Sequence, residues 1–181
     1  MESLKGKSVL ITGATGAIGS ATARLLVAGG AQVFLTGRSA EKLQAIQQEL
    51  KLPADRVFAA DLGKAEEAEA LRQRYHTVFP TIDILVNAAG IGIIKPIENL
   101  SPEEFMVTLQ SNLIAPFLLM KAFLPAMKEV KKGLIINIPG VLGKVPMAGA
   151  AAYSASKYGL TGMMQSIREE LKRTDIRITN L

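Results

Sequence analysis

A glycine-rich segment between an apolar run and a helix-forming run constrains the fold of this chain more than any other feature. Ser8–Thr12 is short and apolar, which predicts a buried strand, and Ser20–Ala28 predicts a helix that ends at two glycines. Between them, Gly13 permits a tight turn, Gly16 lets another group approach the backbone, and Gly19 lets the helix pack closely. This strand–turn–helix unit predicts the start of an open parallel sheet.

Strand and helix signals continue to alternate along the chain. Further strands are expected at residues 32–36, 56–60, 82–87, 134–138 and 176–179, and further helices at 41–50, 65–78, 101–128 and 151–172. The 181 residues, 49% hydrophobic and 20% charged, have the length and composition of one globular domain. We therefore expect residues 1–181 to form a single α/β domain, a three-layer, doubly wound parallel sheet of the Rossmann type with six strands.

The predicted helix over residues 101–128 has a clear start and one expected distortion. Ser101 can cap it, Pro102 suits its first turn, and Glu104 stands where a capping box has its carboxylate. Pro116 lies inside the helix and removes one backbone hydrogen bond, so we expect a kink there.

Composition excludes several kinds of site. The chain has no cysteine, which excludes a disulfide framework, a zinc site with thiolate ligands and a cysteine nucleophile. Its one histidine, His76, falls on the polar side of a predicted helix, where we expect it to be exposed, and we expect no metal site.

The charge and the apolar runs also bear on partners and location. The net charge is +5, but the basic residues are dispersed and aromatic residues are few, so we expect no nucleic-acid partner. No apolar run approaches the roughly 20 residues that span a bilayer, and residues 1–10 lack the apolar core of a signal peptide. We therefore expect a cytoplasmic protein without a membrane partner.

The glycine turn predicts where a nucleotide would bind. A helix that begins directly after such a turn offers free N–H groups and a positive dipole end to phosphates, and no Gly-Lys-Ser/Thr follows that would make it a P-loop. The strand at 32–36 is followed by Gly37 and Arg38, without the carboxylate that would bind the ribose hydroxyls of NAD(H). A guanidinium suits a 2′-phosphate, so we expect NADP(H) to be preferred, with NAD(H) as the alternative.

Asp61 follows the strand at 56–60, and two roles fit it equally well. Its carboxylate can accept a hydrogen bond from the adenine amino group of a bound nucleotide. It can also cap the helix that begins near Lys64. The sequence leaves this choice open.

Tyr153 and Lys157 are the candidates for acid–base chemistry. They lie four residues apart in a predicted helix, so their side chains share one face. An ammonium beside a phenol favours the phenolate form, and such a phenol can protonate the alkoxide that forms when a hydride reaches a carbonyl. Alone, the pair would read as a half-buried tyrosine and a solvated lysine; after a dinucleotide turn it indicates an oxidoreductase site.

From Lys7 to Leu181 the chain resembles the short-chain dehydrogenase/reductase family. The segments that carry the resemblance are residues 12–19, Asp61-Leu62, Asn87-Ala88-Ala89-Gly90, Asn112-Leu113, residues 133–143 and residues 153–157. The cofactor-binding residues that the glycine turn and the resemblance together imply are Gly13, Thr15, Gly16, Ile18, Gly19, Arg38, Asp61, Leu62, Asn87, Tyr153 and Lys157.

The resemblance also implies roles for particular residues. The Asn87 segment would steady the sheet and flank the cofactor, Asn112 would join a proton relay through water to Lys157, and Lys157 would hold the nicotinamide ribose. The helices that match residues 112–128 and 153–172 would form the contacts of a homodimer or homotetramer.

The chain departs from the family pattern at three places. Ala17 stands where the soluble members usually have a glycine, and its methyl group can crowd the phosphates. Gly140 stands where the family has the serine that polarises the substrate carbonyl, and no hydroxyl lies between Ile138 and Tyr153. Loss of one such donor costs ~100- to 1000-fold in rate. The chain stops at Leu181, inside the predicted sixth strand, so we expect an incomplete sequence that lacks the final strand.

These observations predict an oxidoreductase that transfers a hydride between NADP(H) and a small carbonyl or alcohol substrate. Tyr153 would be the acid–base, Lys157 and Asn112 would assist it, and Gly140 would leave the activity impaired. The alternative is a non-catalytic NAD(P)-binding protein with a regulatory or dimerising role, which the glycine at position 140 favours.

Overall fold

In the part of the chain that the structure describes, six parallel strands form one central sheet. The computed structural model describes residues 4–181; residues 1–3, on which part of the expectation for the N-terminus falls, lie outside the described residues. The strands are β1 (Ser8–Thr12), β2 (Gln32–Gly37), β3 (Val57–Ala59), β4 (Ile84–Asn87), β5 (Lys132–Asn137) and β6 (Asp175–Asn180). Their order in the sheet is β3-β2-β1-β4-β5-β6, so the direction of winding changes between β1 and β4. The predicted doubly wound parallel sheet is confirmed.

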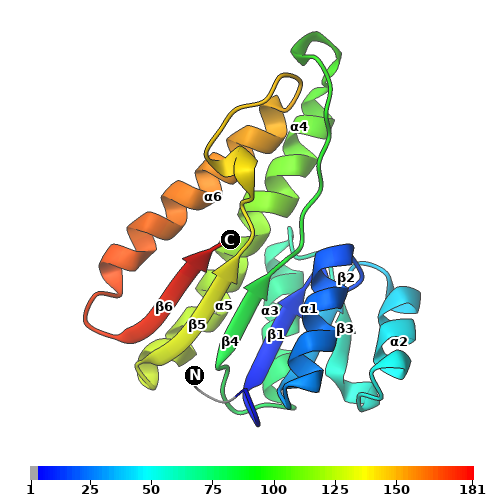
Figure 1. The fold of residues 1–181 in the computed structure, drawn as a ribbon, viewed down its shortest axis with the longest axis vertical. Coiled ribbons are helices and arrows are strands. Elements are labelled where there is room, and N and C mark those ends of the chain that lie inside the picture. The colour runs from blue at the N-terminus through cyan, green and yellow to red at the C-terminus, as the bar shows by residue number, and fades with distance from the viewer. Residues whose placement is uncertain (1–3) are drawn as a thin grey trace.

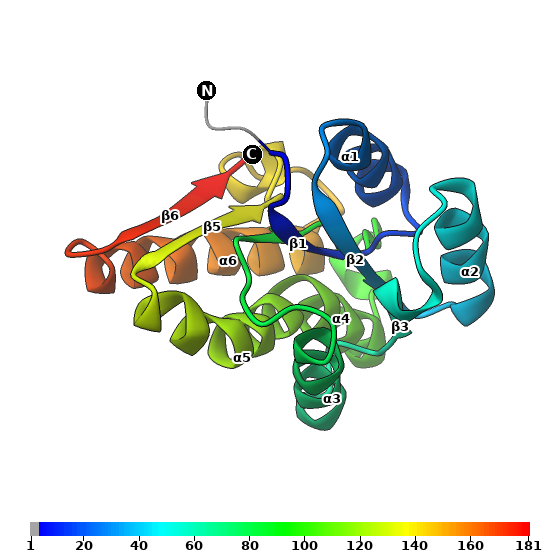
Figure 2. The ribbon, with the colours of Figure 1, turned by 90° about the horizontal axis from the view of Figure 1, so that it is seen from below.

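Helices cover the two faces of this sheet and complete the three predicted layers. They are α1 (Ala17–Ala28), α2 (Ala40–Glu49), α3 (Ala65–His76), α4 (Pro102–Leu109), α5 (Ala115–Glu129) and α6 (Ala151–Glu170). Figure 2 shows α1 and α2 on one face, and α3, α4, α5 and α6 on the other. Short 3₁₀ turns occupy Ala54–Arg56, Ile97–Asn99 and Val141–Gly143, and the first of these shortens β3 relative to the predicted strand.

Alternate side chains of β1 to β5 enter two separate hydrophobic cores, whereas β6 contributes to only one of them. In β1, Leu10 packs with Phe123 on the side of α3, α5 and α6. Val9 and Ile11 point the other way and pack with Ala23 of α1 on the side of α1 and α2. All five residues of β1 are buried, which explains why this strand is a continuous apolar run instead of an alternating one.

The predicted helix over residues 101–128 is divided into two by a π turn. The capping box at its start is confirmed, because the Ser101 side chain accepts from the Glu104 N–H and the Glu104 side chain accepts from the Ser101 N–H. A π-helical turn spans Gln110–Ile114, and Pro116 stands in the first turn of α5. The irregularity expected at Pro116 therefore lies before it, because a proline in a first turn needs no intrahelical N–H bond.

The stretch Pro102–Glu129 is long and apolar enough, by length and composition, to cross a membrane. In this structure, however, it packs in the core: Leu119, Phe123 and Met127 of α5 are almost fully buried. We therefore read it as a core helix, since such helices pass the same test.

The carboxyl ends of the strands all point to one end of the molecule, where two long segments rise above the sheet (Figure 1). One runs from the end of β4 to the start of α4, and the other from the end of β5 to the start of α6. In open α/β sheets, ligands bind outside the carboxyl ends of the strands, at the change of winding. The fold thus places a candidate site beneath these two segments.

Candidate active site

Two glycines of the first turn, Gly13 and Gly19, leave no room for side chains. A Cβ on Gly13, whose φ is +60°, would come 2.6 Å from the Cα of Ala89 in the segment after β4. A Cβ on Gly19 would come 2.2 Å from the carbonyl oxygen of Gly13, so α1 packs directly on the turn. Gly16 is the N-cap of α1 and its Cβ would meet only the Gly13 oxygen, at 3.3 Å. The turn therefore presents bare backbone at the start of a helix.

A cavity of about 260 Å³ lies beside this turn. Thr15 and Gly16 line it from the turn, Arg38 from the end of β2, and Leu62 from the end of β3. The Arg38 side chain is exposed, and no protein partner of its guanidinium is found within residues 4–181. A cation without a partner at the rim of a glycine-lined cavity is suited to bind an anion.

Asp61 also lines this cavity, and its local contacts decide one of the two roles left open by the sequence. Its carboxylate accepts a hydrogen bond from the N–H of Gly63 at 3.3 Å. The N-cap of α3 is Lys64, which receives no side-chain cap. Of the two roles that the sequence left open, the structure therefore does not show the cap: the Asp61 side chain bonds the N–H two residues later and forms a short turn before the helix.

A second cavity, of about 420 Å³, lies over the ends of β4 and β5. Ile18, Gly140, Tyr153 and Lys157 are among its lining residues. The segment Ala88–Gly90 lines both cavities, so the two are neighbouring parts of one hollow that follows the strand ends. Ile18 is 55% exposed at its edge.

Lys157 is buried at the base of the second cavity, with only 5% of its surface exposed. Its Nζ donates a hydrogen bond of 2.8 Å to the carbonyl oxygen of Ile138 and lies 5.4 Å from the centre of the Tyr153 ring. Burial lowers the pKa of Lys157 to about 8, because the charged form loses its hydration. An amine with such a pKa can change charge near neutral pH.

Tyr153 is half-buried in the same cavity, one helical turn before Lys157. Its ring packs against Gly92, where a Cβ would lie 3.5 Å from two ring carbons. No hydrogen-bond partner of its hydroxyl is found in the part of the chain that the structure describes. The hydroxyl is therefore available to a ligand.

Asn112, from the π turn, braces the segment after β4 and lines neither cavity. Its side chain is fully buried, accepts from the N–H of Ile91 at 2.8 Å and donates to the carbonyl of Ile91 at 2.8 Å. It also donates to the hydroxyl of Ser156 in α6 at 3.0 Å. A Cβ on Gly90 would lie 3.1 Å from the Asn112 side chain and 3.5 Å from Nζ of Lys157, so all three are packed together.

Asn87 likewise lines neither cavity, although it was expected among the cofactor-binding residues. It pairs in register with Asn137, which pairs with Asn180. Its side chain donates to Asn137 at 2.8 Å, and Asn137 donates to Asn180 at 3.2 Å. These amides join the ends of β4, β5 and β6 directly below the site, while the Asn87 side-chain oxygen is buried without a partner.

Gly140 has a backbone conformation that favours glycine. Its φ is +65°, and its N–H donates to the carbonyl oxygen of Leu181 at 3.1 Å. A Cβ built on it would meet no heavy atom within 4 Å. The position therefore has space for a side chain but a left-handed backbone that L-residues rarely adopt.

Comparison with known proteins identifies the family. The sequence model for short chain dehydrogenases matches residues 7–181. The chain belongs to the short-chain dehydrogenase family. It is therefore an oxidoreductase of a family that binds nicotinamide cofactors and acts on small molecules.

Individual relatives resemble this short-chain dehydrogenase over nearly its whole length. Nodulation protein G of Rhizobium meliloti is 38% identical over 180 residues, which are 98% of this chain and 72% of the relative. An uncharacterized oxidoreductase of Staphylococcus epidermidis is 32% identical and covers 100% of this chain and 78% of its own length. A metagenomic short-chain oxidoreductase solved in complex with NADP is 39% identical, with a TM-score of 0.92 over 99% of this chain and 82% of that structure.

The hollow of this short-chain dehydrogenase fits an extended dinucleotide. The bare backbone at Gly13 and Gly16 forms a cradle that a Cβ would fill, and the start of α1 directs free N–H groups toward it. From there the hollow continues past Ala88–Gly90 to Tyr153 and Lys157. One arm can therefore hold the adenosine part and the other the nicotinamide part.

Two residues of this site could not be assigned from the sequence. The carbonyl of Ile138 holds Lys157, and Pro139, which follows it, is buried in the wall of the second cavity. Backbone acceptors leave no residue-type signal. The one available clue was the proline, because it forces the preceding residue toward an extended conformation.

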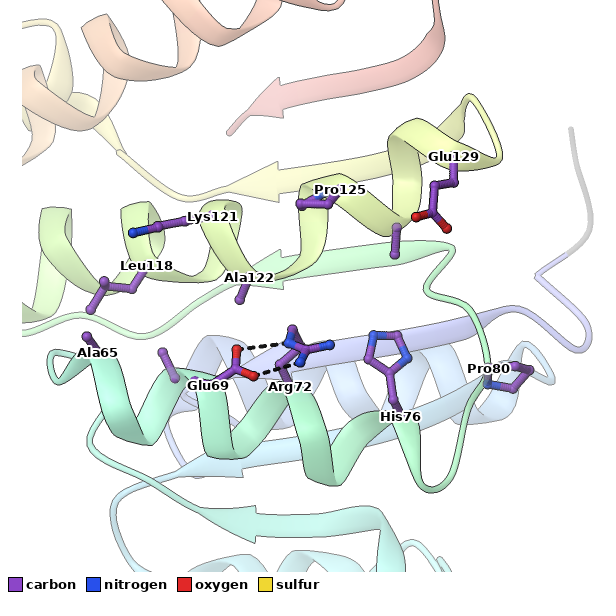
Figure 3. Close-up of a pocket in the computed structure, with 12 residues that line it drawn as sticks. Ala65, Glu69, Arg72, His76, Pro80, Leu118, Lys121, Ala122, Pro125 and Glu129 are labelled. Carbon is purple, nitrogen blue, oxygen red and sulfur yellow. Dashed lines mark hydrogen bonds and ion pairs between the residues drawn. The ribbon is translucent and has the colours of Figure 1, made fainter.

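The groove between α3 and α5 is larger than either part of the hollow, about 760 Å³ (Figure 3). An ion pair of Arg72 with Glu69 crosses its α3 wall. His76 was expected to be exposed but is half-buried here, and its Nδ1 lies 3.1 Å from the carbonyl of Phe79. Within residues 4–181, no cluster of three or more His, Cys, Asp or Glu side chains is arranged to hold a metal.

Proposed function

We propose that this short-chain dehydrogenase transfers a hydride between NADP(H) and a small carbonyl or alcohol substrate, with Tyr153 as the general acid–base. The observation that carries the proposal is the pairing of a phenol and a buried ammonium in a hollow that continues from the glycine turn. The NADP complex of the metagenomic relative supports the choice of cofactor.

Each side chain of the pair has a separate task in this mechanism. A bound nicotinamide supplies or accepts the hydride. In reduction, the Tyr153 hydroxyl donates its proton to the substrate oxygen, and the Lys157 ammonium, 5.4 Å from the ring, stabilises the phenolate that remains. Asn112 fixes Ile91 and Ser156 and so keeps the cavity wall in place.

The preference for NADP(H) over NAD(H) rests on Arg38. Its guanidinium is exposed at the rim of the first cavity, where it can form paired hydrogen bonds with a 2′-phosphate. Thr15, Ile18 and Leu62 are proposed to contact the cofactor because they line the hollow, and Asp61 retains a free oxygen that can accept from adenine.

The experiment is a reduction assay with NADPH and a panel of aldehydes, ketones and diketones, followed by loss of NADPH absorbance. We expect turnover with at least one substrate class, and faster turnover with NADPH than with NADH. Tight binding of NADPH without any turnover would instead favour a non-catalytic NAD(P)-binding protein, the alternative that Gly140 suggests.

The missing hydroxyl at Gly140 gives a second test. Without that donor we expect a rate ~100- to 1000-fold below that of an enzyme that has it. Gly140→Ser has space for the side chain but strains the backbone, since φ is +65°. We expect a faster, less thermostable enzyme, and a folded variant without any gain in rate would refute an impairment caused by Gly140.

Assembly and location remain proposals. We propose one dinucleotide-binding domain that forms a homodimer or homotetramer through α5 and α6. Exposed apolar residues on these helices, Phe117 at 45% and Tyr158 at 43%, support such a contact. The cytoplasmic location stays a prediction.

A further inference from the structure

The turn after β5 holds the lysine of the proposed acid–base pair. The ammonium of Lys157 donates to the carbonyl oxygen of Ile138 at 2.8 Å, and this is its one protein hydrogen bond among residues 4–181. Ile138 stands directly after β5 and directly before Pro139. The direction of a single backbone carbonyl therefore determines where the ammonium lies.

Pro139 restricts the backbone that aims this carbonyl. A residue before proline is pushed toward an extended conformation, and the proline ring fixes its own φ and removes an N–H that could compete for acceptors. The ring is buried, and a Cβ on Gly143 would come 2.8 Å from the Cβ of Pro139 and 3.3 Å from the carbonyl oxygen of Lys157. Gly143 thus lies against both the Pro139 ring and the helix that carries the lysine, so the ring is packed against the residue that joins its turn to α6.

The residues after Pro139 hold this turn in place. The N–H of Gly140 donates to the carbonyl of Leu181 at 3.1 Å, and the N–H of Gly143 donates back to the carbonyl of Gly140 at 3.1 Å. The turn is therefore anchored to the segment after β6 on one side and closed on itself on the other.

We propose that Pro139 is a positioning residue for Lys157: it keeps the Ile138 carbonyl against the ammonium, so that the ammonium stays charged and stays beside the Tyr153 ring. This inference deepens the proposed function. It rests on that function only in that the Lys157 ammonium is used in acid–base chemistry. The hydrogen bond and its effect on the charged form can be measured without turnover.

The other groups around the ammonium give it little stabilisation. Gly90 approaches it from the segment after β4, and Asn112 from the π turn has its amide engaged by Ile91 and Ser156. From α6 the neighbour is the Tyr153 phenol, the one titratable side chain among these groups. Burial lowers the pKa of Lys157 to about 8, so loss of the Ile138 acceptor should lower this pKa further.

The test is the titration of Lys157 in Pro139→Val, followed by ¹³C NMR of the lysine side-chain Cε signals in cofactor-free protein. Valine refills much of the ring volume against Gly143 but leaves the Ile138 backbone unrestrained. We expect the pKa of Lys157 to fall by about half a unit or more relative to the native protein, a threefold or larger change in the equilibrium. The matched control is Pro146→Val, an exposed proline of the same loop, which should leave the titration unchanged.

A folded Pro139→Val protein with the native titration of Lys157 would overturn the proposal. The native protein gives a second measurement that does not depend on the folding of a variant: a coupling across the hydrogen bond between the Lys157 ammonium nitrogen and the Ile138 carbonyl carbon at pH 6. Its absence would also overturn the proposal. If Pro139→Val lowers the pKa of Lys157 and the native protein shows the coupling, but the native protein reduces no carbonyl, the proposed function is contradicted and this inference stands.

Discussion

The groove between α3 and α5 and the hollow at the strand ends differ in what forms their walls. The groove is the larger, about 760 Å³, and side chains of two helices line it (Figure 3). The hollow consists of parts of about 420 Å³ and 260 Å³, and much of its wall is bare backbone from the segments after β1, β4 and β5. In this wall a Cβ on Gly13 would come 2.6 Å from the Cα of Ala89, and a Cβ on Gly63 would come 2.5 Å from the Gln110 side chain.

The two regions also differ in how their polar groups are satisfied. In the groove, Arg72 and Glu69 neutralise each other, and the remaining charged side chains, Lys121 and Glu129, are exposed to solvent. In the hollow, within residues 4–181, the Tyr153 hydroxyl and the Arg38 guanidinium have no protein partner, and the Lys157 ammonium has one carbonyl. Groups without protein partners are those that a ligand can use. The buried Lys157 ammonium beside the Tyr153 phenol has no counterpart among the residues that line the groove, and it marks the proposed site in spite of the groove's larger volume.

Removal of the Tyr153 hydroxyl should give the largest effect. We expect Tyr153→Phe to lower kcat by ~10²- to 10⁴-fold, the usual contribution of a positioned general acid, with NADPH affinity within a few-fold of native. Tyr158→Phe is the matched control, because its hydroxyl bonds to the Lys144 carbonyl outside the hollow. Steady-state assays measure kcat for both variants. If Tyr153→Phe and Tyr158→Phe lost kcat equally, the hollow would not differ from the remaining surface in its effect on activity.

Arg38→Gln should have the next largest effect. Loss of a charged contact to the 2′-phosphate should weaken NADPH binding by ~10- to 100-fold and change NADH binding little. Fluorescence titration with both cofactors measures this, with Arg24→Gln on α1 as the control, since Arg24 is paired with Glu49. Equal weakening of NADPH and NADH would remove Arg38 from phosphate recognition.

Lys157→Met should lose activity but gain stability at neutral pH. Burial lowers the pKa of Lys157 from 10.5 to about 8, so the native state holds this proton less tightly than the unfolded chain does. The stability linked to this group is full above pH 10.5 and is lost as the pH falls to about 8. We expect the variant to be about 1–3 kcal/mol more stable than native at pH 7, with a smaller difference at pH 10. Urea unfolding at both pH values measures it, and a less stable variant at pH 7 would contradict it.

Glu69→Gln in the groove should have the smallest effect. The Arg72 and Gln73 side chains hydrogen-bond the Glu69 carboxylate and hold its pKa at about 2. Its contribution to stability is present above pH 4.5 and lost as the pH falls toward 2. The pair is partly exposed, so we expect a loss below about 1 kcal/mol at pH 6 and unchanged turnover. Steady-state assays of Glu69→Gln, and of Glu129→Gln from the opposite wall as a second groove variant, measure the turnover. A tenfold fall in the kcat of Glu69→Gln would give the groove a catalytic role.

The sheet was predictable because its strands leave strong local signals. β1 was expected at its observed bounds, and the glycine turn fixed where the first helix begins relative to it. The end of the third strand and the division of the helix over residues 101–128 were less accessible. A π turn at Gln110–Ile114 has no distinctive residue types, and Pro116 indicated an irregularity without indicating its kind.

Residue type and spacing predicted that Tyr153 and Lys157 share one helical face, and the structure places both in one cavity, while their catalytic roles stay a prediction. The site was not predictable where tertiary contacts decide. The side chains of Asn87 and Asn112 are buried braces, which the sequence alone could not distinguish from groups that face a ligand. The left-handed φ of Gly140 likewise depends on how the turn meets Leu181, a contact 41 residues away in sequence.

The π turn between α4 and α5 has a consequence for the angular phase of the long helical segment. A π turn accommodates one residue more than an α turn, and one residue corresponds to a rotation of about 100° around the helix axis. The extra residue lets Asn112 reach Ile91 and Ser156 while Leu119 and Phe123, farther along, still face the sheet. A deletion of one residue between positions 110 and 114 would restore a regular helix, but either the brace or the core side chains would then point the wrong way.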